Sequence, residues 1–150
     1  MRIVVTDARF DPIAEIARFA ESANAGALAT FVGYCRDEGG AVTRLELQHY
    51  EGFTQSEIAR LAEPIARRHA LVDLLVIHRS GAVAAGEPIV LVAALSPHRA
   101  SAFKAVEELM DYLKTDAPFW KREVRADGAR WIEPTAQDEA RRKAIADDHG

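Results

Sequence analysis

The sequence predicts an α+β fold in which helices pack on a mostly antiparallel or mixed sheet. Strand-like and helix-like segments alternate along the 150 residues in the order β-α-β-β-α-β-β-α-β-β-α. Short connections join several neighbouring strands, which favours hairpins over the long crossovers that parallel strands need. The apolar share of 49% supports one hydrophobic core, so we expect residues 1–150 to form a single domain with one site.

The N-terminal segment combines a strand with an amphipathic helix. Residues 2–6 form a short apolar run that is typical of a strand. Asp11 then supplies a helix N-cap, and Pro12 stands at the first helical position, where its missing N–H costs nothing. Apolar residues recur at helical spacing to about Glu21, which predicts the first helix.

Two strands and a second helix follow. Residues 27–33 form a compact apolar run and residues 42–50 alternate between apolar and polar, as strands do. The stretch 37–40 between them ends in two glycines and is expected to be a loop. Helical spacing resumes at Thr54, although Pro64 removes a backbone donor there and is expected to kink or divide the helix.

The central part of the chain predicts two buried strands and the most regular helix. Residues 74–78 and 88–95 are apolar, and the second run is apolar on both faces, as in a central strand. Ser96 and Pro97 repeat the cap-then-proline pattern of the first helix. An apolar stripe at helical spacing then extends to about Lys114, which predicts the third helix.

A hairpin and a polar helix complete the predicted fold. Residues 119–124 and 130–132 have strand character, and the Asp-Gly pair at 127–128 is typical of a hairpin turn. Thr135 then caps a polar helix, so residues from about 134 to 150 are expected to form a helix and a tail.

Net charge and cysteine content exclude several classes of function. The 19 basic and 23 acidic residues give a net charge of −4, which argues against charge-driven binding of nucleic acid or of an anionic membrane. No apolar stretch is long enough to span a membrane, and the N-terminus does not resemble a signal peptide. The single cysteine, Cys35, allows no internal disulfide, and no histidines or carboxylates show metal-ligand spacing. We therefore expect a cytoplasmic protein with no metal and no cofactor.

Basic residues at the ends of predicted elements are the remaining candidates for a site, because phosphate-loop, nucleophile and metal motifs are absent. Arg36 follows a strand, where its planar guanidinium suits phosphate or carboxylate, although a solvated surface arginine is the simpler alternative. His98 and Arg99 begin the third helix, whose positive dipole end would strengthen an anion site. Plain helix capping would explain these two residues equally well.

Two lysines flank a short aromatic segment. Lys114 ends the third helix, where the helix dipole alone favours a lysine. Lys121 shares a strand face with Phe119 and Glu123, so its ammonium lies among aromatic groups and beside a carboxylate. Burial would lower the pKa of Lys121 and create a usable acid, base or nucleophile, whereas Glu123 would raise that pKa. The sequence leaves open which effect is larger.

Three further residues have simpler structural interpretations. His78 ends a predicted buried strand, where a structural role is favoured over catalysis. Cys35 has no recognisable activating partner and is interpreted as a small core residue. His49 suits either the edge of the core or a cleft.

A series of motifs runs in order from about residue 2 to residue 133. The longest and most specific is LKTDAPFWKRE at 113–123. The others are ATFVG at 29–33 followed by Arg36, LQHY at 47–50, VIHRSG at 76–81, SPHR at 96–99 leading to Ala102 and Phe103, MDY at 110–112, and RW at 130–131. Together they resemble the family of the large, catalytic subunit of molybdopterin synthase.

The resemblance implies a fold of the α/β-hammerhead type and a sulfur-transfer reaction. The family's large subunits pair as a homodimer and bind two copies of a small ubiquitin-like sulfur carrier, which gives a heterotetramer. The carrier's C-terminal Gly-Gly tail ends in a thiocarboxylate and delivers two sulfurs to cyclic pyranopterin monophosphate. The product is the dithiolene of molybdopterin, a step of molybdenum cofactor biosynthesis.

The resemblance also assigns roles to individual residues. Lys114 and Lys121 match the family's essential pocket lysines. The substrate-binding positions correspond to Arg36, His98 and Arg99, and the pocket-lining positions to Phe31, Met110 and Glu123. A cyclic phosphate needs a local cationic site, which these basic residues could supply despite the negative net charge. Because the one cysteine has no activating partner, the sulfur is expected to arrive on the carrier.

The chain departs from the family pattern at two places, and two other functions stay open. The loop 37–40 is shorter and acidic here, and Cys35 stands where an aliphatic residue is usual. One alternative is a carbonyl enzyme in which Lys121 forms a Schiff base. The other is a non-catalytic oligomerisation or ligand-binding module whose basic residues only hold an anion.

Overall fold

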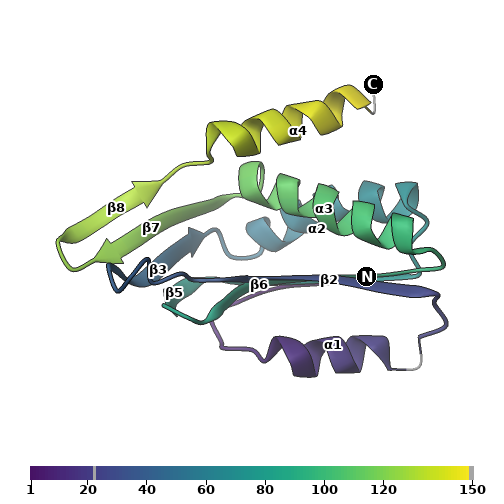
Figure 1. Cartoon of the computed structure of the whole chain (residues 1–150), viewed down its shortest axis with the longest axis horizontal. Helices are drawn as coiled ribbons and strands as arrows, with labels where there is room; N and C mark the ends of the chain where they lie inside the picture. The colour runs from purple at the N-terminus through teal and green to yellow at the C-terminus, as the bar shows by residue number, and fades with distance from the viewer. Residues whose placement is uncertain (22, 149–150) are drawn as a thin grey trace.

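The computed structural model of the protein describes residues 1–21 and 23–148. Over these residues the chain forms eight strands and four helices (Figure 1). In chain order they are β1 (Arg2–Thr6), α1 (Pro12–Ala20), β2 (Ala27–Tyr34), β3 (Val42–His49), α2 (Phe53–Arg68), β4 (Asp73–Arg79), β5 (Gly81–Ala84), β6 (Pro88–Ser96), α3 (Arg99–Thr115), β7 (Phe119–Arg125), β8 (Gly128–Ile132) and α4 (Ala136–Asp148).

The strands form two four-stranded sheets, in the orders β1-β4-β6-β2 and β5-β3-β7-β8. β1 runs parallel to β4, and the other strand pairs of the described residues are antiparallel. The predicted α+β fold with a mostly antiparallel, mixed sheet is therefore confirmed.

The first sheet lies between two helical layers. α1 covers one face of this sheet, and α2 with α3 covers the other (Figure 1). Successive residues of β4 alternate between the two layers, so that Leu75 packs on the α1 side and Val76 on the side of α2 and α3. β4 and β6 are buried on both faces, which explains why their sequences are almost continuously apolar.

The second sheet is covered on one face only. Leu45, Leu47 and Val83 are buried on its inner face, whereas Trp120 and Trp131 on β7 and β8 stay exposed. The hairpin of β7 and β8 extends away from the first sheet (Figure 1). This hairpin brings the chain back toward α3 and so places the segment after β8 beside the end of that helix.

α4 returns along α3 and is held there mainly by charge (Figure 1). Arg141 Nε donates to Asp111 at 3.0 Å, and its Nη2 donates to Glu107 at 3.0 Å. The guanidinium of Arg142 lies 4.0 Å from the centre of the Tyr112 ring. The predicted cap is confirmed, since Thr135 Oγ1 accepts from the backbone N–H three residues on. Residues 149 and 150 of the predicted tail lie outside the described residues.

Two local predictions differ from the structure near the ends of strands. β5 was not expected, because its four residues begin with a glycine and lie between two turn signals. Ser96 does not cap α3, because it is the last residue of β6 and pairs with Ala27 in the sheet. The N-cap of α3 is His98, whose N–H donates to Ser96 Oγ at 3.2 Å.

Pro64 does not divide the second helix, which continues from Phe53 to Arg68. The prediction of a kink or division at Pro64 left out the packing of the apolar face of α2 on the core. Ile58, Ala62 and Ile65 are buried there against the core, and this burial offsets the cost of one missing backbone hydrogen bond. None of the helices in the described part of the chain is long and apolar enough to cross a membrane.

Candidate functional site

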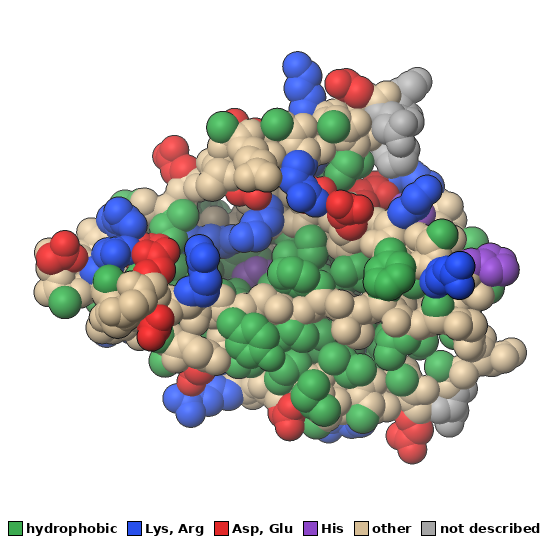
Figure 2. Space-filling view, in the orientation of Figure 1, with side chains coloured by type: hydrophobic (Ala, Val, Ile, Leu, Met, Phe, Trp, Pro, Cys, Tyr) green, Lys and Arg blue, Asp and Glu red, His purple; other side chains and the backbone are tan. Residues whose placement is uncertain are grey.

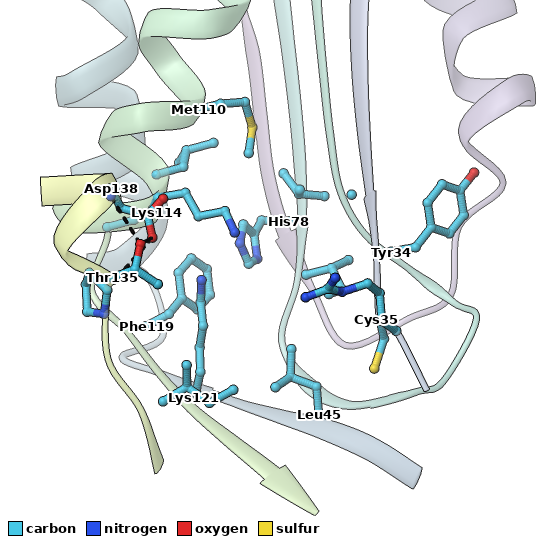
Figure 3. Close-up of a pocket in the computed structure, with 18 of the residues that line it drawn as sticks. Tyr34, Cys35, Leu45, His78, Met110, Lys114, Phe119, Lys121, Thr135 and Asp138 are labelled. Atoms are coloured by element: carbon cyan, nitrogen blue, oxygen red, sulfur yellow. Dashed lines mark hydrogen bonds between the residues drawn. The ribbon is translucent and has the colours of Figure 1, made fainter. Parts of the chain in front are cut away.

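A cavity of about 420 Å³ lies where the two sheets meet the end of α3 and the segment that follows β8 (Figure 3). Six of the eight site residues that the family resemblance assigns line it: Phe31, Arg36, Met110, Lys114, Lys121 and Glu123. They come from β2 and the loop after it, from α3 and from β7. Figure 2 shows a hollow bordered by Lys and Arg side chains, with apolar surface next to it.

The two lysines enter this cavity from different elements. Lys114 lies in the last turn of α3, and Lys121 lies on β7, where it pairs with Leu47 of β3. Alternation along β7 turns Phe119 and Lys121 inward and leaves Trp120 45% exposed outside, as the sequence predicts. Both lysine side chains extend toward the centre of the cavity (Figure 3).

Burial decides the question that the sequence left open for Lys121. The pKa of Lys121 is lowered to about 8, mainly by burial and also by the charge of Lys114, whereas the charge of Asp138 opposes the shift. Glu123 does not neutralise the lysine, because its carboxylate accepts hydrogen bonds from Arg125 at 2.9 Å and Arg130 at 3.1 Å. Neither lysine forms an ion pair within residues 1–21 and 23–148.

His78 also lines the cavity, although the sequence analysis interpreted it as structural. It is 3% exposed and its ring stacks on that of Phe119, with 3.9 Å between centroids and 18° between planes. Burial lowers the pKa of His78 to about 3, so the ring is neutral near pH 7. The sequence contained a signal for the position of His78. Alternation along the strand puts this residue on the same face as Val76.

Thr135 and Asp138, at the start of α4, form the wall of the cavity beside Lys114 (Figure 3). Both the N–H and the hydroxyl of Thr135 donate to Asp138 Oδ2, at 3.0 and 2.7 Å. These bonds, together with the charges of Lys114 and Lys121, lower the pKa of Asp138. The sequence predicts the cap but gives no signal that α4 folds back to the lysines.

Arg36 lies at the rim of the cavity. Its side chain is 84% exposed, and its closest carboxylate is that of Glu38, at 3.9 Å from Nη2. The guanidinium is thus weakly held and free to contact an anion that enters the cavity. Glu38 itself accepts a shorter hydrogen bond from Arg125, at 3.1 Å.

His98 and Arg99 do not meet the lysines of their own chain. They stand at the first turn of α3, whereas Lys114 lies in its last turn, and both are exposed. A helix of 17 residues separates its two ends by about 24 Å. All these basic residues were expected to form one site, but the length of α3 keeps His98 and Arg99 away from Lys114 and Lys121 of the same chain.

Cys35 is 5% exposed, which confirms its interpretation as a small core residue. Burial raises the pKa of the Cys35 thiol, so it is protonated near pH 7 and is a weak nucleophile. No group of three or more His, Cys, Asp or Glu side chains in the described residues is arranged to hold a metal ion. The cavity presents the amines of Lys114 and Lys121, which can donate or accept protons and stabilise negative charge.

The chain is similar to known proteins over most of its length. The family model described as MoaE protein matches residues 5–116. The chain is 49% identical to the molybdopterin synthase catalytic subunit of Cereibacter sphaeroides over 141 residues, which cover 93% of this chain and 97% of that protein.

Two solved structures share the fold. The molybdopterin biosynthesis MoaE protein of Burkholderia ambifaria aligns with a TM-score of 0.81 and 38% identity over 97% of this chain and 99% of that one. The molybdopterin synthase of Staphylococcus aureus aligns with a TM-score of 0.79 and 25% identity, over 88% of this chain and 98% of that one. The chain therefore belongs to the MoaE protein family, that of the molybdopterin synthase catalytic subunits.

Proposed function

We propose that this chain transfers sulfur from the C-terminal thiocarboxylate of a small ubiquitin-like carrier to cyclic pyranopterin monophosphate, and so forms the dithiolene of molybdopterin. The observation that carries the proposal is the cavity that Lys114 and Lys121 both enter, and in which neither forms an ion pair with another described residue. These two lysines belong to the LKTDAPFWKRE segment, the most specific part of the family resemblance.

The two amines divide the work of the reaction. Lys114 contacts the reacting thiocarboxylate or the substrate, and its positive charge stabilises the anion there. Lys121 positions the reacting groups and shuttles protons as the acyl group leaves, since an amine with a pKa of about 8 exchanges protons readily near neutral pH. No protein thiol is needed, because the sulfur arrives on the carrier and Cys35 is buried and protonated.

Arg36 binds the phosphate of the substrate from the rim of the cavity, and Phe31 with Met110 supplies apolar walls for its ring system. Glu123 has a structural role in the cavity wall, because Arg125 and Arg130 already bind its carboxylate. The relatives' name, catalytic subunit, describes one part of a larger enzyme. In this proposal the C-terminal tail of the carrier enters the cavity. The assembly consists of two chains and two carriers and works in the reducing cytoplasm.

His98 and Arg99 act on the substrate across a homodimer. About 24 Å of helix separates them from their own lysines, so any contact with substrate must be in the cavity of the other chain. Mixing a K114A chain with an R99A chain tests this directly. Each homodimer would be inactive, whereas a mixed dimer would contain one intact cavity and regain activity; no recovery in mixed dimers would contradict the arrangement.

The assay for the whole proposal uses the purified chain, its thiocarboxylated carrier and the cyclic substrate. Wild type would form the dithiolene, and K114A would lose it while keeping the dimer and its circular dichroism spectrum. K104M, at an exposed position of the same helix, serves as the matched control. Turnover by K114A close to that of wild type would reject the assignment.

The low pKa of Lys121 also favours one second function, an amine nucleophile that forms a Schiff base with a carbonyl substrate. Borohydride would then trap a covalent adduct on Lys121. We expect no adduct with the cyclic substrate, and an adduct that disappears in K121M would replace the sulfur-transfer proposal.

A further inference from the structure

The floor of the cavity carries a hydrogen-bond acceptor that the proposed roles of the lysines leave unused. His78 lines the cavity, and the acceptor is the second nitrogen of its ring, Nε2. The other ring nitrogen, Nδ1, lies 2.7 Å from the carbonyl oxygen of Arg79. Because a carbonyl oxygen only accepts, Nδ1 must carry the proton, and Nε2 of the neutral ring is left with a lone pair.

Several contacts hold this acceptor in one place. The ring stacks on Phe119, and Phe119 also contacts His49, at 6.2 Å between ring centroids. β4 is an inner strand of its sheet, and His78 pairs with Val5 on one side and Val90 on the other. The His78 ring is fixed by the hydrogen bond at Nδ1 and by stacking on one face. It therefore cannot rotate, and the lone pair of Nε2 keeps one orientation.

The acceptor differs from the charged groups around the cavity. Lys114, Lys121 and Arg36 present only N–H groups. Three of the carboxylates are engaged, Glu123 with two arginines, Glu38 with Arg125 and Asp138 with Thr135, and a fourth, Glu133, lies exposed after β8. In the part of the chain that the structure describes, the hydrogen bond of the His78 ring is the one at Nδ1, and no group donates to Nε2.

A neutral imidazole suits this place for an electrostatic reason. Burial lowers the pKa of His78 to about 3, and the nearby charge of Lys121 acts in the same direction. The ring therefore adds no further positive charge beside two lysines. It complements a neutral N–H group of a ligand, whereas the lysines and Arg36 complement the ligand's anionic parts.

We propose that His78 positions the substrate at the floor of the cavity by accepting, at Nε2, a hydrogen bond from a ring N–H of its nitrogen heterocycle. The inference rests on the proposed function and deepens it, because a reduced pterin carries several such N–H groups while its phosphate faces the basic rim. A ligand that offers an oxygen or a bare ring nitrogen at that position loses the bond and binds more weakly.

A matched pair of variants separates the acceptor from the packing of the ring. H78Q places an amide oxygen close to the position of Nε2, whereas H78M has nearly the same length and no comparable acceptor. The dissociation constant for cyclic pyranopterin monophosphate would rise about fivefold to a hundredfold in H78M and by clearly less in H78Q. Binding of the carrier alone would be equal in the two. Equal substrate affinity in H78Q and H78M would overturn the inference.

A second measurement uses wild-type protein and does not depend on whether either variant folds. The 15N resonance of the unprotonated His78 nitrogen would move when substrate is added, as expected on hydrogen bonding, and would stay unmoved when carrier is added alone. An unmoved resonance in the presence of bound, convertible substrate would overturn the role of His78 and leave the proposed function standing. Absence of substrate binding and of turnover in wild type would instead overturn the proposed function, and this inference with it.

Discussion

Lys114 and Lys121 point into one cavity from two separate elements, and the charge of Lys114 helps to lower the pKa of Lys121. The larger cause of that low pKa is burial. Of the two amines, Lys121 therefore releases its proton more readily near neutral pH. A pair that acts as acid and base needs such a difference.

Removing the charge of Lys114 should raise the pKa of Lys121. In K114M the repulsion that disfavours the second ammonium is absent, so the pKa of Lys121 would move up from about 8 toward its ordinary value of 10.5, without reaching it because burial remains. Side-chain NMR titration of labelled lysine measures the shift. K104M should leave it unchanged, and an equal or lower pKa in K114M would show that the two amines do not interact.

Removing the charge of Asp138 should have the opposite effect. Asp138 is the group that raises the pKa of Lys121, so D138N would lower it below about 8. The amide oxygen of asparagine can still accept the hydrogen bonds of Thr135, which keeps the start of α4 in place. The acid limb of the pH–rate profile would move to lower pH in D138N and stay in place in D147N, an exposed aspartate on the same helix. An unmoved limb would mean that Asp138 only caps α4.

Local patterns were sufficient to predict most elements and the inward face of β7. The Asp11-Pro12 helix start and the Asp-Gly hairpin turn depend on neighbouring residues only, and both were found where predicted. Phe119, Lys121 and Glu123 share the cavity because alternation along a strand is a strictly local rule. Recognition of the two lysines as a pair needed only the short segment between α3 and β7.

The features that the sequence did not predict depend on contacts between distant segments. Ser96 matches a cap pattern, yet pairing with Ala27 keeps it in β6. His98 and Arg99 were grouped with the lysines by residue type, and only the length of α3 shows that one chain cannot unite them. His78 was interpreted as structural because it ends a buried strand, and its place in the cavity beside residues of α3 and β7 is visible only in the fold.

His78 should make the protein sensitive to acid. Its pKa is about 3 in the folded chain and near 6.5 when unfolded, so between these values the unfolded chain binds a proton that the folded chain does not. Stability therefore falls as pH drops from about 6.5, by up to about 1.4 kcal/mol per pH unit from this group. Urea denaturation at pH 7 and pH 5 would show a smaller loss in H78Q than in wild type. H98Q, at an exposed position, should behave as wild type, and equal losses in all three proteins would contradict the assignment.

Lys121 should reduce stability at neutral pH, as expected of a residue kept for function. Its pKa is lowered in the folded chain from 10.5 to about 8, so below pH 8 both states are protonated and the folded state carries the cost of a buried ammonium. K121M removes that cost and would stabilise the protein at pH 7 by about 1 to 3 kcal/mol after discounting for partial exposure. The advantage would shrink as pH rises from 8 to 10.5, because wild-type Lys121 then loses its proton on folding.

Thermal or urea denaturation of wild type and K121M at pH 7 and pH 10 measures this difference, with K104M as the control for losing an exposed lysine. The same K121M protein should fail in the sulfur-transfer assay, since methionine fills the volume but moves no proton. A variant that is more stable and inactive would identify Lys121 as a residue held in the cavity at a cost to folding. A K121M protein that is less stable than wild type at pH 7 would show that the ammonium is well solvated in the cavity, and would remove the physical basis for its low pKa.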